Sequence, residues 1–230
     1  MADAVLESLI RDRIVALGEE IPADVTLMAV TKRVSVERMR IAYGCGLRHF
    51  GESRIQEALP KQEALADAPD LVWHFIGKLQ SNKAQKAIAH FDWIHSVDSL
   101  KLAQRLDRLA GEMNRFPNLC LQVKLLPDPN KSGWDVADLR EALPELYKLK
   151  QVMIRGLMVI PPLGLTPDKL QRCFMDAATL AKEIRQESKT VWPQFDQLSM
   201  GMSGDYREAI AAGSTVVRLG RTIFGEREAR

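Results

Sequence analysis

Short apolar runs alternate with longer amphipathic segments along this chain, from its first residues to its last. The apolar runs are partly β-branched and stop at glycine, proline or charged residues, which is typical of buried strands. The segments between them place apolar residues three and four positions apart, which is typical of helices. The pattern predicts eight strands, at residues 25–31, 48–51, 71–77, 92–97, 119–125, 152–160, 197–200 and 215–219.

A helix is expected before the first strand and between successive strands. The predicted helices cover residues 1–18, 35–45, 53–66, 81–89, 98–113, 134–149, 167–187 and 205–212. Asp98 is expected to cap the helix that follows the fourth strand. Eight strands with helices between them predict one α/β domain over residues 1–230, a (β/α)8 barrel of the TIM type. A doubly wound open sheet is the alternative.

The composition agrees with a globular protein and excludes several classes of partner. Hydrophobic residues make up 46% of the chain and charged residues 27%, and the net charge is only +2. This balance gives no bulk attraction to nucleic acid or to a membrane surface. No apolar run approaches the roughly 20 residues that span a bilayer, and the N-terminus does not have the pattern of a signal peptide. We therefore expect a cytoplasmic protein with no nucleic-acid or membrane partner.

The cysteines and the acidic residues point to no redox or metal chemistry. The three cysteines, Cys45, Cys120 and Cys173, are far apart and are expected to be buried free thiols. The sequence shows neither a metal-ligand spacing nor a catalytic Ser-His-Asp order, so no metal is expected.

Lys32 directly follows the first predicted strand, and functional residues of such barrels gather at the carboxyl ends of the strands. Its amine can form a Schiff base with an aldehyde cofactor when burial or a neighbouring cation suppresses its charge. The alternative is a surface lysine just past a strand.

Two polar loops follow the last two strands, where these barrels commonly bind phosphate. The first contains Ser203 and Gly204, and the second contains Gly220, Arg221 and Thr222. Backbone N–H groups, two hydroxyls and glycines that permit close approach suit a phosphate dianion. The alternative is ordinary turn residues near a helix start.

Arg218 lies inside the otherwise apolar last strand, where an unpaired cation would be costly. Two interpretations stay open: it faces a ring nitrogen of a heterocyclic cofactor, or it forms a structural pair with Glu52 or another acid. His74 and His95 lie within the third and fourth strands and are expected to be core or rim histidines rather than catalysts.

Several short segments, taken together, carry a family resemblance. They are residues 29–32, 49–52, 56–57, 74–77, 79–83, 131–133, 156–158, 198–203 with Asp205, 217–220 and 223–225. They resemble the fold-type III pyridoxal phosphate (PLP) proteins, which share the barrel of the alanine racemase N-terminal domain. More closely, they resemble the single-domain pyridoxal phosphate homeostasis proteins (the YggS, PROSC and PipY family), and residues 121–126 are similar to the cyanobacterial branch, PipY.

The resemblance implies PLP as the cofactor and also implies the residues that bind it. These are Lys32, Ser203, Arg218, Gly220, Arg221 and Thr222. Lys32 would carry PLP as a Schiff base, and Arg218 would face the pyridine nitrogen. The other four would hold the phosphate, with Arg221 contributing its backbone amide. Many relatives have asparagine in place of Ser53 and another asparagine near Lys124, so this chain departs from the family there.

The function implied by the resemblance is PLP (vitamin B6) and amino-acid homeostasis by a monomeric carrier with no catalytic residue, whose recipients would be apo PLP-enzymes. The alternative is an amino-acid racemase of the same fold, but racemases add a β domain and use a tyrosine from the partner subunit as the second base. The three tyrosines, Tyr43, Tyr147 and Tyr206, do not lie at predicted strand ends. A regulatory interaction protein and a phosphosugar isomerase are further alternatives, and the isomerase would give Lys32 no role.

Overall fold

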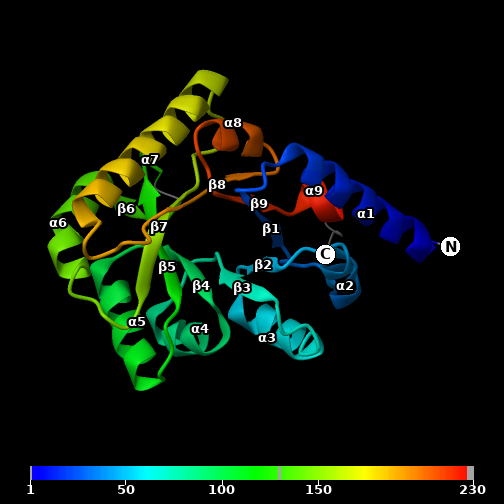
Figure 1. Cartoon of the computed structure of the whole chain (residues 1–230), viewed down its shortest axis with the longest axis horizontal. Helices are drawn as coiled ribbons and strands as arrows, with labels where there is room; N and C mark the ends of the chain where they lie inside the picture. Colours follow the sequence, from blue (N-terminus) through cyan, green and yellow to red (C-terminus); the bar gives the residue numbers. More distant parts are fainter. Residues whose placement is uncertain (1, 129–130, 227–230) are drawn as a thin grey trace.

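Eight parallel strands close into a barrel in the computed structural model, which describes residues 2–128 and 131–226 (Figure 1). The barrel closes because β1 pairs with β9 as well as with β2, and β4 pairs with β5. The predicted (β/α)8 architecture is therefore confirmed, and the open sheet is excluded. The barrel strands are β1 (Thr26–Val30), β2 (His49–Glu52), β3 (Val72–Phe75), β4 (Trp93–Val97), β5 (Asn118–Lys124), β7 (Met153–Val159), β8 (Gln197–Met202) and β9 (Val216–Leu219).

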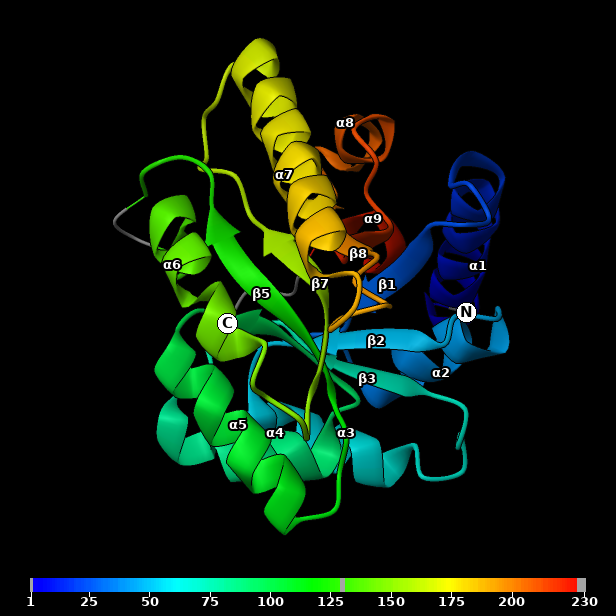
Figure 2. The ribbon, with the colours of Figure 1, turned by 60° about the vertical axis from the view of Figure 1, so that its left-hand side comes forward.

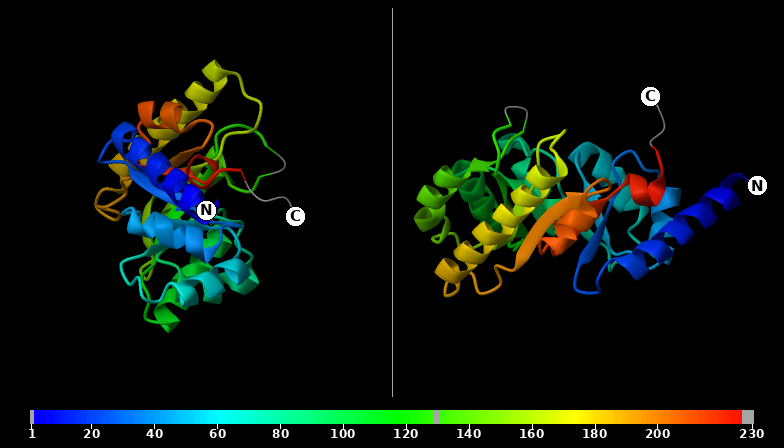
Figure 3. Two further views of the ribbon diagram at one scale, coloured as in Figure 1. Left: turned by 90° about the vertical axis from the view of Figure 1, so that its right-hand side faces the viewer. Right: turned by 90° about the horizontal axis from the view of Figure 1, so that it is seen from above.

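Helices cover the outside of this barrel, and Figure 2 shows α5, α6 and α7 beside β5 and β7. The helices are α1 (Ala2–Glu20), α2 (Val36–Gly44), α3 (Ile55–Ala64), α4 (Ala84–His90), α5 (Leu100–Glu112), α6 (Val136–Leu146), α7 (Pro167–Ser188), α8 (Tyr206–Ala211) and α9 (Arg221–Phe224). A short 3-10 helix, η1 (Ser81–Lys83), precedes α4. The first helix packs against α2 and α9, which lie near it in Figure 3.

The apolar core lies between the barrel and these helices, in two clusters. One joins the apolar faces of α4, α5, α6 and α7 to the middle strands, with Phe91, Leu106 and Phe174 among its fully buried members. The other joins α1 and α2 to β1, β2 and β9. Close packing of neighbouring strands also needs a small residue: a Cβ atom on Gly156 would lie 1.7 Å from the carbonyl oxygen of Gln197. Glycine therefore lets β7 approach β8.

Three local features differ from the sequence-based prediction. The α5 helix is capped by Ser99 rather than Asp98, because the Ser99 Oγ accepts the Leu102 N–H at 3.4 Å. The short strand β6 (Trp134–Asp135) pairs with β5 where a helix start is predicted, and α9 follows the last strand. All three depend on where neighbouring strands end, which periodicity alone does not specify.

Candidate cofactor-binding site

A cavity of about 390 Å³ opens at the carboxyl ends of the strands. It brings together five of the six predicted site residues: Lys32, Ser203, Arg218, Gly220 and Arg221. The sixth, Thr222, donates its backbone N–H to the Ser203 Oγ at 3.4 Å, which ties the loop after β9 to the loop after β8. Residues from opposite ends of the chain meet here because β1 and β9 are neighbours in the closed barrel.

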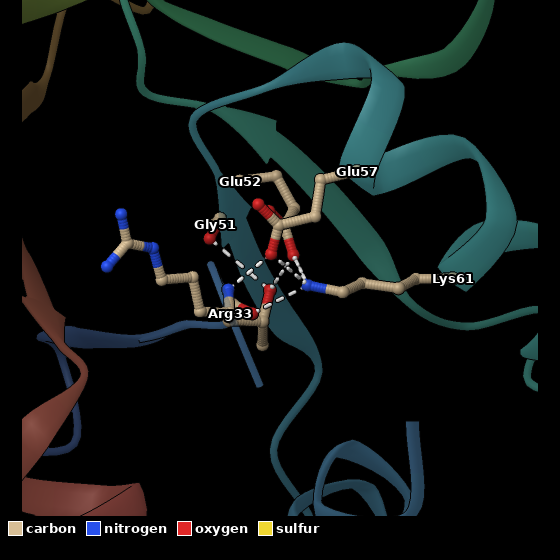
Figure 4. Close-up of polar contacts among 6 residues, drawn as sticks. Arg33, Gly51, Glu52, Glu57 and Lys61 are labelled. Atoms are coloured by element: carbon tan, nitrogen blue, oxygen red, sulfur yellow. Dashed lines mark hydrogen bonds and ion pairs between the residues drawn. The ribbon is translucent and has the colours of Figure 1, made fainter. Parts of the chain in front are cut away.

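Lys32 is half-buried, and side chains hold the backbone on both sides of it. Figure 4 shows Glu57 and Lys61 beside Arg33, the residue that follows Lys32. On one side, Lys61 Nζ donates to the Thr31 carbonyl oxygen at 2.8 Å. On the other side, the Arg33 N–H donates to Glu57 Oε1, and Arg33 adopts a φ of 60°, which non-glycine residues rarely adopt. The position of Lys32 is thus imposed from α3 rather than by the strand alone.

Lys61 also joins two carboxylates, those of Glu52 and Glu57, in one network. Lys61 Nζ lies 2.7 Å from Glu52 Oε1 and 2.9 Å from Glu57 Oε1, and the Thr31 hydroxyl donates to Glu52 Oε1 at 2.8 Å. The other oxygen of Glu52, Oε2, is buried without a hydrogen-bond partner among the described residues. Burial raises the pKa of the Glu52 carboxyl, while the bond from Lys61 opposes that rise.

The loops after β8 and β9 present small residues to the cavity. A Cβ atom on Gly220 would lie 3.3 Å from the Val30 carbonyl oxygen, so a side chain there would crowd β1. Gly201 has a φ of 91°, and a Cβ atom on it would lie 2.6 Å from the Cβ of Ala209. Gly220 lines the cavity and leaves its backbone close to any bound group, whereas Gly201 lies inside β8 and lets that strand approach α8.

The charge around the cavity favours an anion. Its charged lining side chains are Lys32, Arg218, Arg221 and Asp205, so cations outnumber the one carboxylate. Asp205 Oδ1 accepts the Met202 N–H at 2.6 Å, and burial raises the pKa of the Asp205 carboxyl. Two hydroxyl-bearing residues, three cations and exposed loop backbone together form a donor set that suits a phosphate dianion.

Arg218 makes its contacts with oxygen atoms of the barrel and not with an acid. Its Nη1 donates to the Ser199 carbonyl oxygen at 2.6 Å and to the Ser199 Oγ at 2.8 Å, and its Nη2 donates to the Val159 carbonyl oxygen at 2.9 Å. The proposed pair with Glu52 is therefore wrong, because Glu52 is occupied by Lys61. Burial lowers the pKa of Arg218 to about 10, which leaves it cationic at neutral pH.

The burial predicted for His74, His95, Cys120 and Cys173 is confirmed, whereas Cys45 is more exposed than predicted. His74 and His95 are buried, at 2% and 0% exposure. Cys120 and Cys173 are buried free thiols, Cys45 is a half-buried one, and burial raises the pKa of Cys120 to about 12. Among the side chains that the structure describes, those of residues 5–128 and 131–226, no group could hold a metal ion. Over the same residues, no helix is long and apolar enough to cross a membrane.

Sequence reasoning missed two parts of the surroundings. The apolar loop of residues 160–165 lines one side of the cavity, and Leu163 on it is 90% exposed. The contacts of Lys61 and Glu57 with the backbone beside Lys32 were also missed. The i,i+4 spacing of Glu57 and Lys61 on α3 is nevertheless visible in the sequence. The pairing with Glu52 comes from β2 and has no local signal.

The family to which the chain belongs follows from comparison with known proteins. Residues 7–228 match the family described as alanine racemase, N-terminal domain, so the chain belongs to that class of barrel proteins. Alanine racemase of Clostridium difficile 630 shares this fold at 13% identity, with a TM-score of 0.75 over 96% of this chain and 58% of that one.

Within that class, the chain belongs to the family of pyridoxal phosphate homeostasis proteins. It is 55% identical to the protein of that name from Synechocystis sp. (strain ATCC 27184 / PCC 6803 / Kazusa), over 90% of this chain and 94% of the relative. It is 38% identical to the Escherichia coli (strain K12) protein of the same name, over 95% and 94%. The structure of PipY from Synechococcus elongatus PCC7942 without PLP is 57% identical, with a TM-score of 0.90 over 94% of this chain and 100% of that one. A second PipY structure has PLP bound and gives 56% identity and a TM-score of 0.88, over 94% and 100%.

Proposed function

We propose that this protein binds PLP in the cavity at the strand ends and carries it for PLP (vitamin B6) and amino-acid homeostasis, without catalytic turnover. The observation that carries the proposal is the meeting of Lys32, Arg218 and the two polar loops around one cavity. The similarity to PipY, which has been solved with PLP bound, supports it.

The residues present fit the cofactor at each of its reactive groups. Lys32 supplies the amine that would hold the aldehyde, and Ser203, Thr222 and the backbone of Gly220 and Arg221 would hold the phosphate. Arg218 would face the pyridine nitrogen. When bound, PLP supplies an electrophilic aldehyde and an electron-withdrawing ring.

Arg218 favours a carrier over an enzyme. A guanidinium has donors only, so it cannot hold a proton on the pyridine nitrogen as a carboxylate would. Its three bonds to Ser199 and Val159 keep it in the barrel, and no described carboxylate bonds to it. The ring would stay a weak electron sink, which restrains chemistry at a bound amino acid.

The tyrosines give no support to a racemase. Tyr43 donates its hydroxyl to Asp70 at 2.6 Å, and Tyr206 donates to Glu20 at 2.8 Å. Tyr147 packs edge-on against Trp192. None of the three lines the cavity. A racemase needs a second base facing the first across the substrate, and these side chains are engaged elsewhere.

The proposal also covers the domain organisation, oligomeric state, location and recipients of this protein. Residues 1–230 would form one PLP-binding domain, monomeric in the cytoplasm, with apo PLP-enzymes as recipients of the cofactor. Sedimentation at micromolar concentration should give a mass near 25.8 kDa, and a tight dimer would contradict the monomer.

A spectrum before and after borohydride tests the central assignment. The purified, PLP-loaded protein should be yellow, and borohydride should fix the cofactor to the peptide that contains Lys32. Lys32→Ala should abolish the fixed label, whereas Lys124→Ala, at the end of β5, should keep it. A label on Lys83 or Lys124, or an unchanged spectrum in Lys32→Ala, would show that the assignment is wrong.

A further inference from the structure

Three histidines and a serine form a continuous hydrogen-bonded chain inside the barrel, behind the cavity. His49 Nδ1 lies 3.0 Å from His74 Nε2, and His74 Nδ1 lies 2.9 Å from His95 Nε2. His95 Nδ1 lies 3.1 Å from the Ser199 Oγ, which also accepts an N–H from Arg218 at 2.8 Å. The chain crosses from β2 through β3, β4 and β8 to β9. It therefore links a half-buried histidine to the arginine of the cavity.

Arg218 fixes which atom donates and which accepts in each hydrogen bond of this chain. Arg218 can only donate, so it occupies one lone pair of the Ser199 hydroxyl. In the described part of the protein, His95 Nδ1 is the one other partner of that hydroxyl. The hydroxyl proton is satisfied only if it points to His95 Nδ1, which must then be unprotonated. A buried hydroxyl with an unmade bond would cost free energy.

The same matching of hydrogen-bond donors to acceptors then applies to each ring in turn. A neutral imidazole has one donor and one acceptor nitrogen, so His95 carries its proton on Nε2 and donates to His74 Nδ1. His74 likewise donates from Nε2 to His49 Nδ1. His49 is left with an Nε2–H that no other member of the chain uses. One serine hydroxyl thus specifies the tautomer of three rings.

Burial keeps the chain neutral. His74 and Ser199 are 2% and 0% exposed, and no acidic side chain takes part in the chain. Desolvation lowers the pKa of all three histidines, and Arg218 lowers that of His95 further. A proton added to His95 would place a second cation on the hydroxyl that already serves Arg218.

We infer that Ser199, His95, His74 and His49 are positioning residues for Arg218, held in a single Nε2–H tautomer by the Ser199 hydroxyl; the role toward the cofactor rests on the proposed function. The chain and two carbonyl oxygens take three of the five guanidinium N–H groups. The remaining N–H groups belong to Nε and Nη2, and Arg218 lines the cavity. A fixed guanidinium presents the same donors to every ring nitrogen that enters.

Nitrogen-15 NMR of the histidine rings tests the chain without any cofactor. The rings of His49, His74 and His95 should each show an unprotonated Nδ1 and a protonated Nε2, with the exposed His90 as an internal reference. Ser199→Ala should let at least one ring populate the Nδ1–H form. The matched control is Ser96→Ala, which removes another buried serine hydroxyl from β4 that has no partner in the described structure. An Nδ1–H ring in the wild-type protein, or identical ring signals in Ser199→Ala, would overturn the inference.

The PLP-loaded protein tests the link to the cavity. Ser199→Ala should shift the absorption maximum of bound PLP and release it about tenfold faster, as expected for one lost hydrogen bond to a charged group. Ser199→Thr keeps the hydroxyl and should restore both properties, and Ser96→Ala should change neither. If Ser199→Ala reorders the rings but leaves spectrum and release unchanged, positioning of Arg218 is refuted. If the wild type takes up no PLP, the proposed function fails, whereas the histidine tautomers still show whether the hydrogen-bonded chain exists.

Discussion

Lys61 and Glu52 form an ion pair of 2.7 Å that is almost fully removed from water, beside the peptide that leads into Lys32. The Lys61 side chain is 10% exposed and the Glu52 side chain 0% exposed. Because both charges are desolvated, loss of one partner leaves the other uncompensated, unlike the loss of a surface pair. The pair also holds Thr31 through its carbonyl oxygen and its hydroxyl, so stability and the placement of Lys32 depend on the same contact.

Lys61→Met should lower the free energy of unfolding by about 3–5 kcal/mol, because it leaves a buried carboxylate without its cation. Denaturant unfolding measures this loss. The PLP-loaded variant should also release its cofactor faster, since Thr31 is no longer held. Lys148→Met is the control, because the Lys148–Glu145 pair is exposed and should contribute about 0–1 kcal/mol. Equal losses in the two variants would contradict a structural role for the buried pair.

The phosphate should carry much of the affinity for PLP. Ser203→Ala and Thr222→Ala each remove a hydroxyl from the polar loops after β8 and β9. A hydrogen bond to a charged group contributes roughly 1.5–3 kcal/mol. Each variant should bind PLP about tenfold to a hundredfold more weakly, and pyridoxal without phosphate should bind much more weakly than PLP. The two losses need not add, since both hydroxyls serve one dianion.

Release of PLP to an apo-enzyme acceptor measures these affinities. Thr179→Ala is the control, since that hydroxyl lies on the exposed face of α7 and bonds to the Met175 carbonyl oxygen. Unchanged release from the Ser203→Ala/Thr222→Ala double variant would place the anion site elsewhere in the molecule.

Amino-acid turnover should be absent. A typical enzyme turns over at about 1–1000 per second, and assays with D- and L-amino acids should find nothing near that rate. The physical reason is the donor-only partner at the ring and the engagement of all three tyrosines outside the cavity. Robust racemisation that survives repurification and disappears in Lys32→Ala would instead establish an enzyme.

Stability should fall on acidification through the buried histidines. Their pKa values are depressed in the folded state, to about 3 for His95, whereas the unfolded chain takes up protons near the ordinary value of about 6.5. The unfolded state therefore binds more protons as pH falls below about 6.5, which favours unfolding. His74 and His95 together should contribute up to about 2.7 kcal/mol of destabilisation per pH unit. The raised pKa of Glu52 acts in the opposite direction, since its stabilising effect is lost as pH rises.

Unfolding free energies measured between pH 7 and 4 would show this slope. His74→Gln removes one titrating group and should reduce the slope by about one proton, whatever its effect on stability at pH 7. His90→Gln, at an exposed position, is the matched control. An equal slope in wild type and His74→Gln would mean that the buried ring does not control acid unfolding.

The sequence by itself determined the order and type of the main elements. Periodicity is a local property, so the strands and most helices lie within a few residues of their predicted bounds; α7, predicted at 167–187, is Pro167–Ser188. It also placed Lys32, Arg218 and the two polar loops at strand ends, because parallel strands present their carboxyl ends on one side. The Ser99 cap, β6 and α9 escaped prediction because each depends on where a neighbouring strand stops.

Only the tertiary structure decided which side chains meet. Closure of β1 onto β9 brings Lys32 and Arg218 to one cavity although 186 positions separate them in the sequence. In the folded protein, Arg218 donates to serine and carbonyl oxygens instead of pairing with Glu52. Glu52 pairs with Lys61. His95 and Ser199 are 104 residues apart and meet across the barrel interior. Such contacts have no local signature, since they depend on the stagger of strands in the closed sheet and on which side chains fill its interior.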